Sequence, residues 1–183
     1  AKHRDQASRV ACLRRASALQ VEAGESAKAI PVLMQIIELE PTDSESVFTL
    51  TDAHLATGAH PEAIAALSRC IDALGEAGQS VLEVLRRRAA VRQDAGDPQG
   101  GLEDLEAAYT LDAAAVSSDL EDAIVDRRAQ ASEANAADEV RSLSLRLCEV
   151  RLGRGDRGDA RSILIELAEQ APEDLEVLHR LRA

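Results

Sequence analysis

Histidine and cysteine, the side chains that most often carry chemistry, are few in this sequence and lie far apart. His54 and His60 are its only neighbouring histidines, but the spacing predicts them on different helices, with Asp52 as the one nearby carboxylate. Zinc needs three or four converging ligands of these types, so we expect no metal site. The cysteines are odd in number and lie within apolar helical patterns, which favours buried, unreactive thiols in a reducing compartment. They are Cys12, Cys70 and Cys148.

Neighbouring carboxylates could form an acid and base pair, but here they lie near the starts of predicted helices. This holds for Glu103-Asp104 and for Glu173-Asp174, where the exposed backbone amides of a first turn stabilise negative charge. The sequence contains no nucleophile elbow, Walker loop or dinucleotide fingerprint, and Gly153-Arg154-Gly155 is interpreted as a helix turn. We therefore expect no catalytic residues, no cofactor and no enzyme activity.

The charge of the chain limits its partners. The formal net charge is -12, which disfavours attraction to nucleic acid or to an anionic membrane. The sequence has no apolar run of about 18 residues or more, so we expect no membrane insertion. The run Arg86-Arg87-Arg88 either marks a docking point for an acidic partner or forms a solvated face, with pairing such as Glu83 with Arg87.

The elements that must position these side chains are short amphipathic helices. Hydrophobic residues make up 45% of the chain and are mainly Ala, Leu, Val and Ile, which favours close packing of helices. The stretch 11–41 is interpreted as two helices joined by a turn at Gly24. The same pattern returns around Gly58, Gly96 and Gly155. A hairpin this short cannot enclose its own apolar face, so it must stack on its neighbours.

Three local expectations follow from this pattern. Thr42 and Glu45 form a capping box that starts the third helix. Pro31 bends the second helix or delays its start. The repeat pattern is interrupted over residues 113–135, because the predicted helix over 118–134 has no glycine turn after it.

The repeating pattern resembles the tetratricopeptide repeat (TPR), a helix-turn-helix unit of 34 residues. The family's aromatic position on the first helix of each unit is lost in all four copies, where Gln20, His54, Arg92 and Arg151 stand. The matching positions are Leu13, Ala16, Ser17, Gly24, Ala29, Leu33, Ile36 and Pro41 in the first copy, Val47, Leu50, Thr51, Gly58, Ala63, Leu67 and Cys70 in the second, Leu85, Ala89, Gly96, Leu105 and Ala108 in the third, with Gly101 where the family prefers Ala, and Leu147, Cys148, Gly155, Ala160, Leu164, Leu167 and Pro172 in the last.

This resemblance implies an all-α fold. We expect a right-handed superhelix of about ten antiparallel helices, a TPR-like solenoid, with an irregular unit near 113–135. Residues 1–183 are expected to form a single domain. Because the sequence begins without Met or an apolar signal core, we expect it to be a fragment of a longer protein. The predominance of arginine over lysine indicates a bacterial source, and we expect a cytoplasmic location.

The resemblance also implies a function. Proteins of this family are non-catalytic scaffolds that hold a protein or peptide partner in a concave groove or on a flank. The alternative is a regulatory or tethering segment of a larger enzymatic, sensory or envelope-assembly protein. The sequence identifies neither the partner nor the oligomeric state.

The family's groove positions point to specific residues. The only Phe, Phe48, falls on the groove side with arginines on the helices either side, which suits a peptide with a hydrophobic and an acidic residue. Alternatively, Phe48 packs between helices while the arginines pair with Glu45 and Glu83. The clamp by which some family members grip chaperone tails is broken, since Glu83 stands at one of its basic positions. The candidate groove residues are Arg14, Phe48, Asp52, Leu55 and Arg86.

Overall fold

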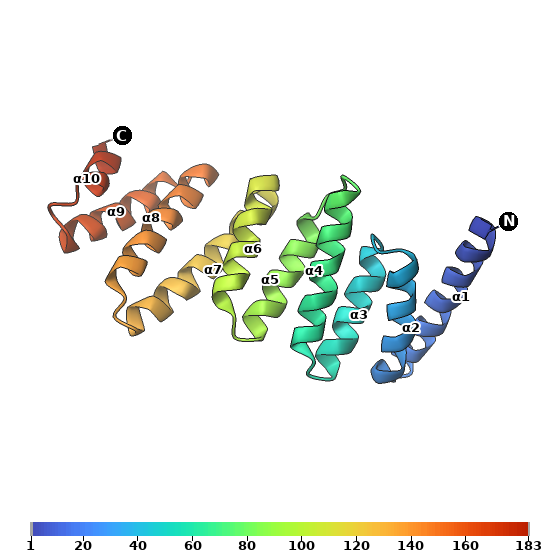
Figure 1. The fold of residues 1–183 in the computed structure, drawn as a ribbon. Coiled ribbons are helices and arrows are strands. Elements are labelled where there is room, and N and C mark those ends of the chain that lie inside the picture. The colour runs from blue at the N-terminus through green and yellow to red at the C-terminus, as the bar shows by residue number, and fades with distance from the viewer. Residues whose placement is uncertain (1, 183) are drawn as a thin grey trace. The chain divides into compact units, whose positions relative to one another are not determined.

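The computed structural model describes residues 2–182, with side chains from residue 6 onward. These residues form ten α-helices and no strand, which confirms the all-α prediction (Figure 1). The helices are α1 (Lys2–Glu22), α2 (Ser26–Leu39), α3 (Ser44–Ala56), α4 (His60–Glu76), α5 (Leu82–Asp94), α6 (Pro98–Leu111), α7 (Ala113–Glu133), α8 (Ala137–Arg154), α9 (Arg157–Gln170) and α10 (Leu175–Arg182).

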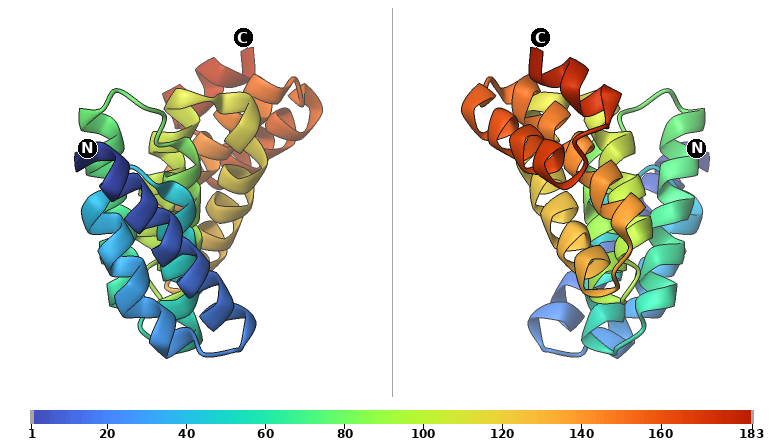
Figure 2. Two further views of the ribbon diagram at one scale, coloured as in Figure 1. Left: turned by 90° about the vertical axis from the view of Figure 1, so that its right-hand side faces the viewer. Right: turned by 90° about the vertical axis from the view of Figure 1, so that its left-hand side faces the viewer.

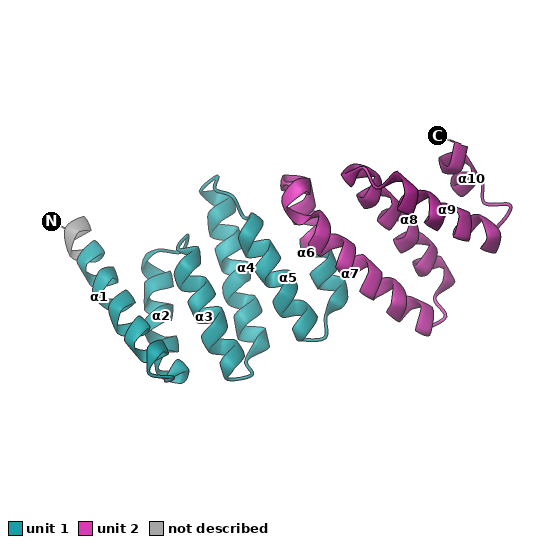
Figure 3. Cartoon of the chain, turned by 180° about the vertical axis from the view of Figure 1, so that it is seen from behind, with its two compact units in different colours: residues 1–104 teal, residues 105–183 magenta. Residues whose placement is uncertain are grey.

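The chain divides into two compact units, and the boundary falls inside α6 (Figure 3). Unit 1 covers Ala1–Asp104 and unit 2 covers Leu105–Ala183. Each repeat of a helical solenoid contacts mainly its neighbours, so such a division also occurs within one repeat domain. A single domain over residues 1–183 stays a prediction.

In unit 1 each helix packs against the next one along the chain. α1 contacts α2, α2 contacts α3, α3 contacts α4 and α4 contacts α5, and successive helices run in opposite directions (Figures 1 and 2). Apolar residues spaced by three and four form one stripe on each helix, and stacking closes these stripes into a core. The largest fully buried side chains in it include Leu33 and Ile36 of α2, Leu50 of α3 and Leu67 of α4.

The central helix of unit 2 is α8. It packs against α7 and α9, while α9 packs against α10. Ion pairs join α8 to α10, through Arg141 with Glu176 at 2.8 Å and Glu149 with Arg180 at 2.9 Å. A further ion pair, between Arg146 and Glu106 at 2.5 Å, joins α8 to α6. Among the residues that the structure describes, no helix is both long enough and apolar enough to cross a membrane.

The irregular stretch is one continuous helix of 21 residues, α7. It begins at Ala113, not near residue 118, because the Asp112 carboxylate caps it by accepting a hydrogen bond from the Ala115 amide at 3.1 Å. The turn that follows uses Asn135, whose φ of 56° is left-handed like that of the turn glycines. Asn is one of the few residues other than Gly that visits this region readily. A chain reversal is therefore present where no glycine marks it.

The predicted late start of α2 is wrong. α2 begins at Ser26 and contains Pro31 in its second turn. The first hydrogen bond of the helix, from the Ala29 amide to the Glu25 carbonyl at 3.2 Å, forms before the proline is reached. Helical hydrogen bonding has therefore begun before Pro31, so the proline does not set where the helix begins.

The predicted capping box at Thr42 and Glu45 is also wrong. The N-cap of α3 is Asp43, whose carboxylate accepts from the Ser46 amide at 3.3 Å and from the Ser46 hydroxyl at 2.6 Å. Asp is preferred over Thr at this position.

Close packing explains the departure from the family pattern at Gly101. A Cβ atom there would lie 3.0 Å from the Ala89 carbonyl oxygen of α5. That approach is tighter than ordinary van der Waals contact, so an Ala at this position would push the start of α6 away from α5.

Substitutions at Asn135 test the left-handed turn. Asn135→Ala should lower the free energy of unfolding by about 1 kcal/mol, whereas Asn135→Gly should leave it unchanged or raise it, because only Ala pays the steric cost of a positive φ. Urea unfolding monitored by circular dichroism measures both. The matched control is Ala134→Gly, at φ -78°, where glycine should give no gain. Equal stability of the Ala and Gly variants at 135 would contradict the turn.

Candidate functional site

The predicted groove residue Arg14 is tied to carboxylates of its own chain. Its guanidinium donates to Glu40 Oε2 and to Asp43 Oδ2, both at 2.7 Å, which links α1 to the loop before α3. Burial would raise the pKa of the Asp43 carboxyl, but hydrogen bonds from Ser46 and Arg14 outweigh burial and lower this pKa. Arg14 therefore acts first as a link within unit 1.

The other charged groove residues are paired as well. Asp52 of α3 forms an ion pair with Arg87 of α5, and Arg86 pairs with Glu83 of its own helix at 3.2 Å. The structure thus brings Asp52 to Arg87. The carboxylates next to Arg14 and Arg86 are side chains of this chain, and a partner's acidic group would compete with them.

The two apolar groove residues, Phe48 and Leu55, lie on α3 and are half-buried. Both pack against the core of unit 1, and their spacing of seven places them on the same side of the helix. Each side chain is therefore part of the core and part of the surface. Binding of a partner at this groove stays a prediction.

A buried ionic cluster lies where α4, α5 and α6 meet in unit 1. Asp104 is 3% exposed and accepts two hydrogen bonds from Arg88, at 2.6 and 2.9 Å. Arg92 adds an ion pair to Asp104 at 3.1 Å, and the Ser68 hydroxyl accepts from Arg88 at 2.9 Å. The carboxylate and both guanidinium groups are thus engaged within the chain, which makes the cluster a structural link and not an open site. Sequence analysis missed it, although Arg92 at an aromatic position of the family was a signal.

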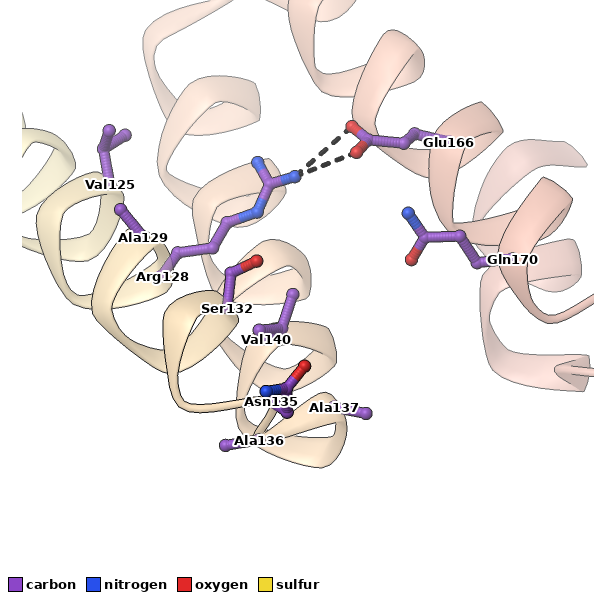
Figure 4. A pocket seen from close by; sticks show the side chains of 10 residues that line it. All are labelled: Val125, Arg128, Ala129, Ser132, Asn135, Ala136, Ala137, Val140, Glu166 and Gln170. Carbon is purple, nitrogen blue, oxygen red and sulfur yellow. Dashed lines mark hydrogen bonds and ion pairs between the residues drawn. The ribbon is translucent and has the colours of Figure 1, made fainter.

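A cavity of about 550 Å³ opens in unit 2 between α7, α8 and α9 (Figure 4). Figure 4 shows Arg128 reaching from α7 to Glu166 on α9, where its guanidinium donates to both carboxylate oxygens at 3.2 and 3.3 Å. None of the predicted groove residues lines this cavity. Sequence reasoning missed it because its walls come from the stretch where the repeat is lost. The lining residues are Val125, Arg128, Ala129, Ser132, Asn135, Ala136, Ala137, Val140, Glu166 and Gln170.

The cysteines are not all buried, as the sequence pattern suggested. Cys70 and Cys148 are buried, and burial raises the pKa of both thiols. Cys12 is exposed, because on α1 the buried face runs through Val10 and Ser17. Within the described residues, no group of three or more His, Cys, Asp or Glu side chains is placed to hold a metal ion.

Asp174 joins α10 to α8 in unit 2. Its carboxylate accepts from Arg141 at 2.5 and 3.0 Å and caps α10 by accepting from the amides of Glu176 and Val177. The hydrogen bonds from Arg141, aided by those backbone amides, lower the pKa of Asp174 to about 2. The last helix is therefore held to unit 2 by charge as well as by its one buried side chain, Val177.

Stacked helical hairpins of this kind are the architecture of solved repeat proteins. No family model matches the sequence, and none of the curated proteins matches it. A crystal structure of MamA protein aligns with a TM-score of 0.53 at 15% identity, covering 92% of this chain and 97% of that chain. MamA from Desulfovibrio magneticus RS-1 aligns with a TM-score of 0.53 at 17% identity, covering 91% and 97%.

A third structure carries the name of the repeat. A tetratricopeptide repeat protein from Parabacteroides merdae ATCC 43184 aligns with a TM-score of 0.51 at 17% identity, covering 95% of this chain and 71% of that chain. The fold of this chain is therefore that of the tetratricopeptide repeat proteins, as the glycine-marked hairpins predicted.

Removing the charge of Asp104 tests the buried cluster. Asp104→Asn should lower the free energy of unfolding by about 3 kcal/mol, because it leaves Arg88 with no counter-charge in a largely buried site and leaves Arg92 only Asp97, at 3.9 Å. The matched control, Asp52→Asn, breaks the more exposed pair with Arg87 and should cost less than about 1 kcal/mol. Urea unfolding measures both values. Equally small losses would show that the cluster is open to solvent.

The pKa of Asp174 gives a test of α10 docking. Since its pKa in the folded chain lies below the ordinary value of 3.8, the stabilisation by Asp174 is complete above that value and is lost as the pH falls through about 2. Carboxyl NMR titration should give a midpoint near 2 in the wild type. In Arg141→Gln the midpoint should rise toward 3.8. An unchanged midpoint would show that Arg141 does not contact Asp174.

Proposed function

We propose that this chain is a non-catalytic scaffold that binds a protein or peptide partner through the side of unit 1 formed by α1, α3 and α5. The observation that carries the proposal is the half-buried state of Phe48 and Leu55 on α3. Stacked helical hairpins form extended surfaces of this kind, suited to hold another chain.

The ion pairs of unit 1 support this use of the surface. Arg14 with Asp43 fixes α1 against the start of α3, and Asp52 with Arg87 fixes α3 against α5. A surface whose helices are held in place loses little conformational entropy when a partner binds. Because these charges already have partners, apolar contact with Phe48 and Leu55 supplies most of the binding free energy, and the charges at the rim give orientation.

The partner proposed is a protein segment with a hydrophobic anchor residue. The acidic residue suggested by Arg14 and Arg86 would have to displace Asp43 or Glu83, so we place it second to the hydrophobic anchor. The cytoplasmic location and the bacterial source stay predictions.

Phe48→Ala tests this site. The half-buried ring should cost about 1–2 kcal/mol of stability when removed, and partner capture should fall at least about tenfold if the ring is an anchor. Affinity capture from the source cells with the wild type and the variant, followed by mass spectrometry, measures the loss for each captured protein.

The matched control is Ile71→Ala in α4. Ile71 is half-buried against the same core but lies on a different helix, so its removal should cost similar stability and leave capture intact. Equal losses of capture in the two variants would assign the Phe48 effect to stability and would refute the site.

A further inference from the structure

The cavity of unit 2 is large enough for a small ligand or for a short peptide segment with its side chain. Its volume of about 550 Å³ falls in the range of small-ligand sites, and its apolar lining comes from α7, α8 and the turn between them. Val125 and Ala129 lie on α7 and Val140 lies on α8. Val125 is 42% exposed, so this wall is open to a partner and is not closed core.

Three uncharged polar side chains line the same cavity. Ser132, Asn135 and Gln170 project from α7, from the turn and from α9 (Figure 4). None of the three side chains forms a hydrogen bond with another part of the chain that the structure describes. Amide and hydroxyl groups of this kind can donate to and accept from the backbone of an extended segment.

The arginines at the cavity already form ion pairs within the chain. Arg128 pairs with Glu166, and the neighbouring Arg127 pairs with Glu139 at 2.5 Å. The basic residues of α9, Arg157 and Arg161, lie on the face opposite Glu166 by helical periodicity.

Negative charges around the cavity remain without partners. Each wall segment carries a carboxylate next in sequence to a lining residue, and none of these carboxylates has an ion pair within the described chain. These exposed carboxylates lie one residue from lining positions, so unit 2 carries unpaired negative charge near the cavity, which attracts a basic segment and repels an acidic one. The four residues are Asp126 and Glu133 of α7, Asp138 of α8 and Glu169 of α9.

We infer that this cavity binds a segment of a partner protein that presents one aliphatic side chain between lysine or arginine residues. The aliphatic side chain enters between Val125, Ala129 and Val140. The basic residues meet the unpaired carboxylates at the rim, and the segment's backbone bonds to Ser132, Asn135 and Gln170. This site lies wholly within unit 2 and does not depend on the proposed surface in unit 1.

A set of three labelled peptides tests the inference. The first has one leucine flanked on each side by two lysines, the second replaces the leucine with serine, and the third replaces the lysines with glutamates. Fluorescence anisotropy with the full chain should show the first peptide binding at least about tenfold more tightly than either of the others. Its affinity should fall as the salt concentration rises, because the rim contributes by charge.

Two variants locate the binding. Ala129→Phe fills the cavity without changing charge and should weaken the first peptide at least about tenfold. The matched control, Ala107→Phe, makes the same change at an exposed position of α6 in unit 2 and should change the affinity less than about twofold. Asp126→Asn combined with Glu133→Gln should weaken binding and reduce its dependence on salt.

Several results would overturn the inference. One is equal affinity for the leucine and serine peptides, which would indicate charge attraction alone. Another is binding that Ala129→Phe leaves intact, and a third is no binding of the first peptide. Phe48→Ala should leave the peptide affinity unchanged, so failure here and failure of the unit 1 site are distinguishable.

Discussion

The structure depends on one constraint: a short amphipathic helix has an apolar stripe that its own hairpin cannot cover. The chain must therefore reverse direction within a few residues and bring the next helix onto that stripe. A residue in the left-handed conformation makes such a reversal possible directly after a helix. The residues that do this after α1, α3, α4, α5, α7 and α8 are Gly24, Gly58, Gly78, Gly96, Asn135 and Gly155. Their spacing decides which apolar faces meet, and all other contacts in the two units form within that arrangement.

Arginine side chains join neighbouring helices at positions where the tetratricopeptide repeat pattern has aromatic side chains. With one Phe and one Tyr, the chain has few large rings with which to join neighbouring helices. At two of the lost aromatic positions, Arg92 reaches Asp104 of α6 and Arg151 reaches Glu121 of α7. Arg146 does the same in unit 2, pairing with Glu106 and covering the Tyr109 ring at 5.2 Å. The net charge of -12 follows from the excess of acidic over basic residues in the sequence.

The spacing of apolar residues and glycines was sufficient to predict helices and hairpins, since both follow from local geometry. Predictions failed where two neighbouring residues could fill the same structural role, or where the sequence contained no recognisable pattern. Asp43 caps α3 in place of Thr42, because both residues suit that role and only the three-dimensional structure selects one. The alanines at the start of α7 form no apolar stripe, so the sequence pattern could not predict its first turn. The cavity of unit 2 could not be predicted at all, because its walls come from three helices whose packing no short motif encodes.

The two candidate surfaces differ in how they can discriminate between partners. On the unit 1 surface, the charged side chains form ion pairs with one another. Phe48 and Leu55 therefore offer apolar contact that many partner sequences could satisfy. At the unit 2 cavity, the guanidinium groups are neutralised while Asp126 and Glu133 are not, so the sign of a partner's charge matters. Specificity is a difference between affinities, and a like charge at a rim rejects wrong partners more effectively than an apolar patch selects right ones.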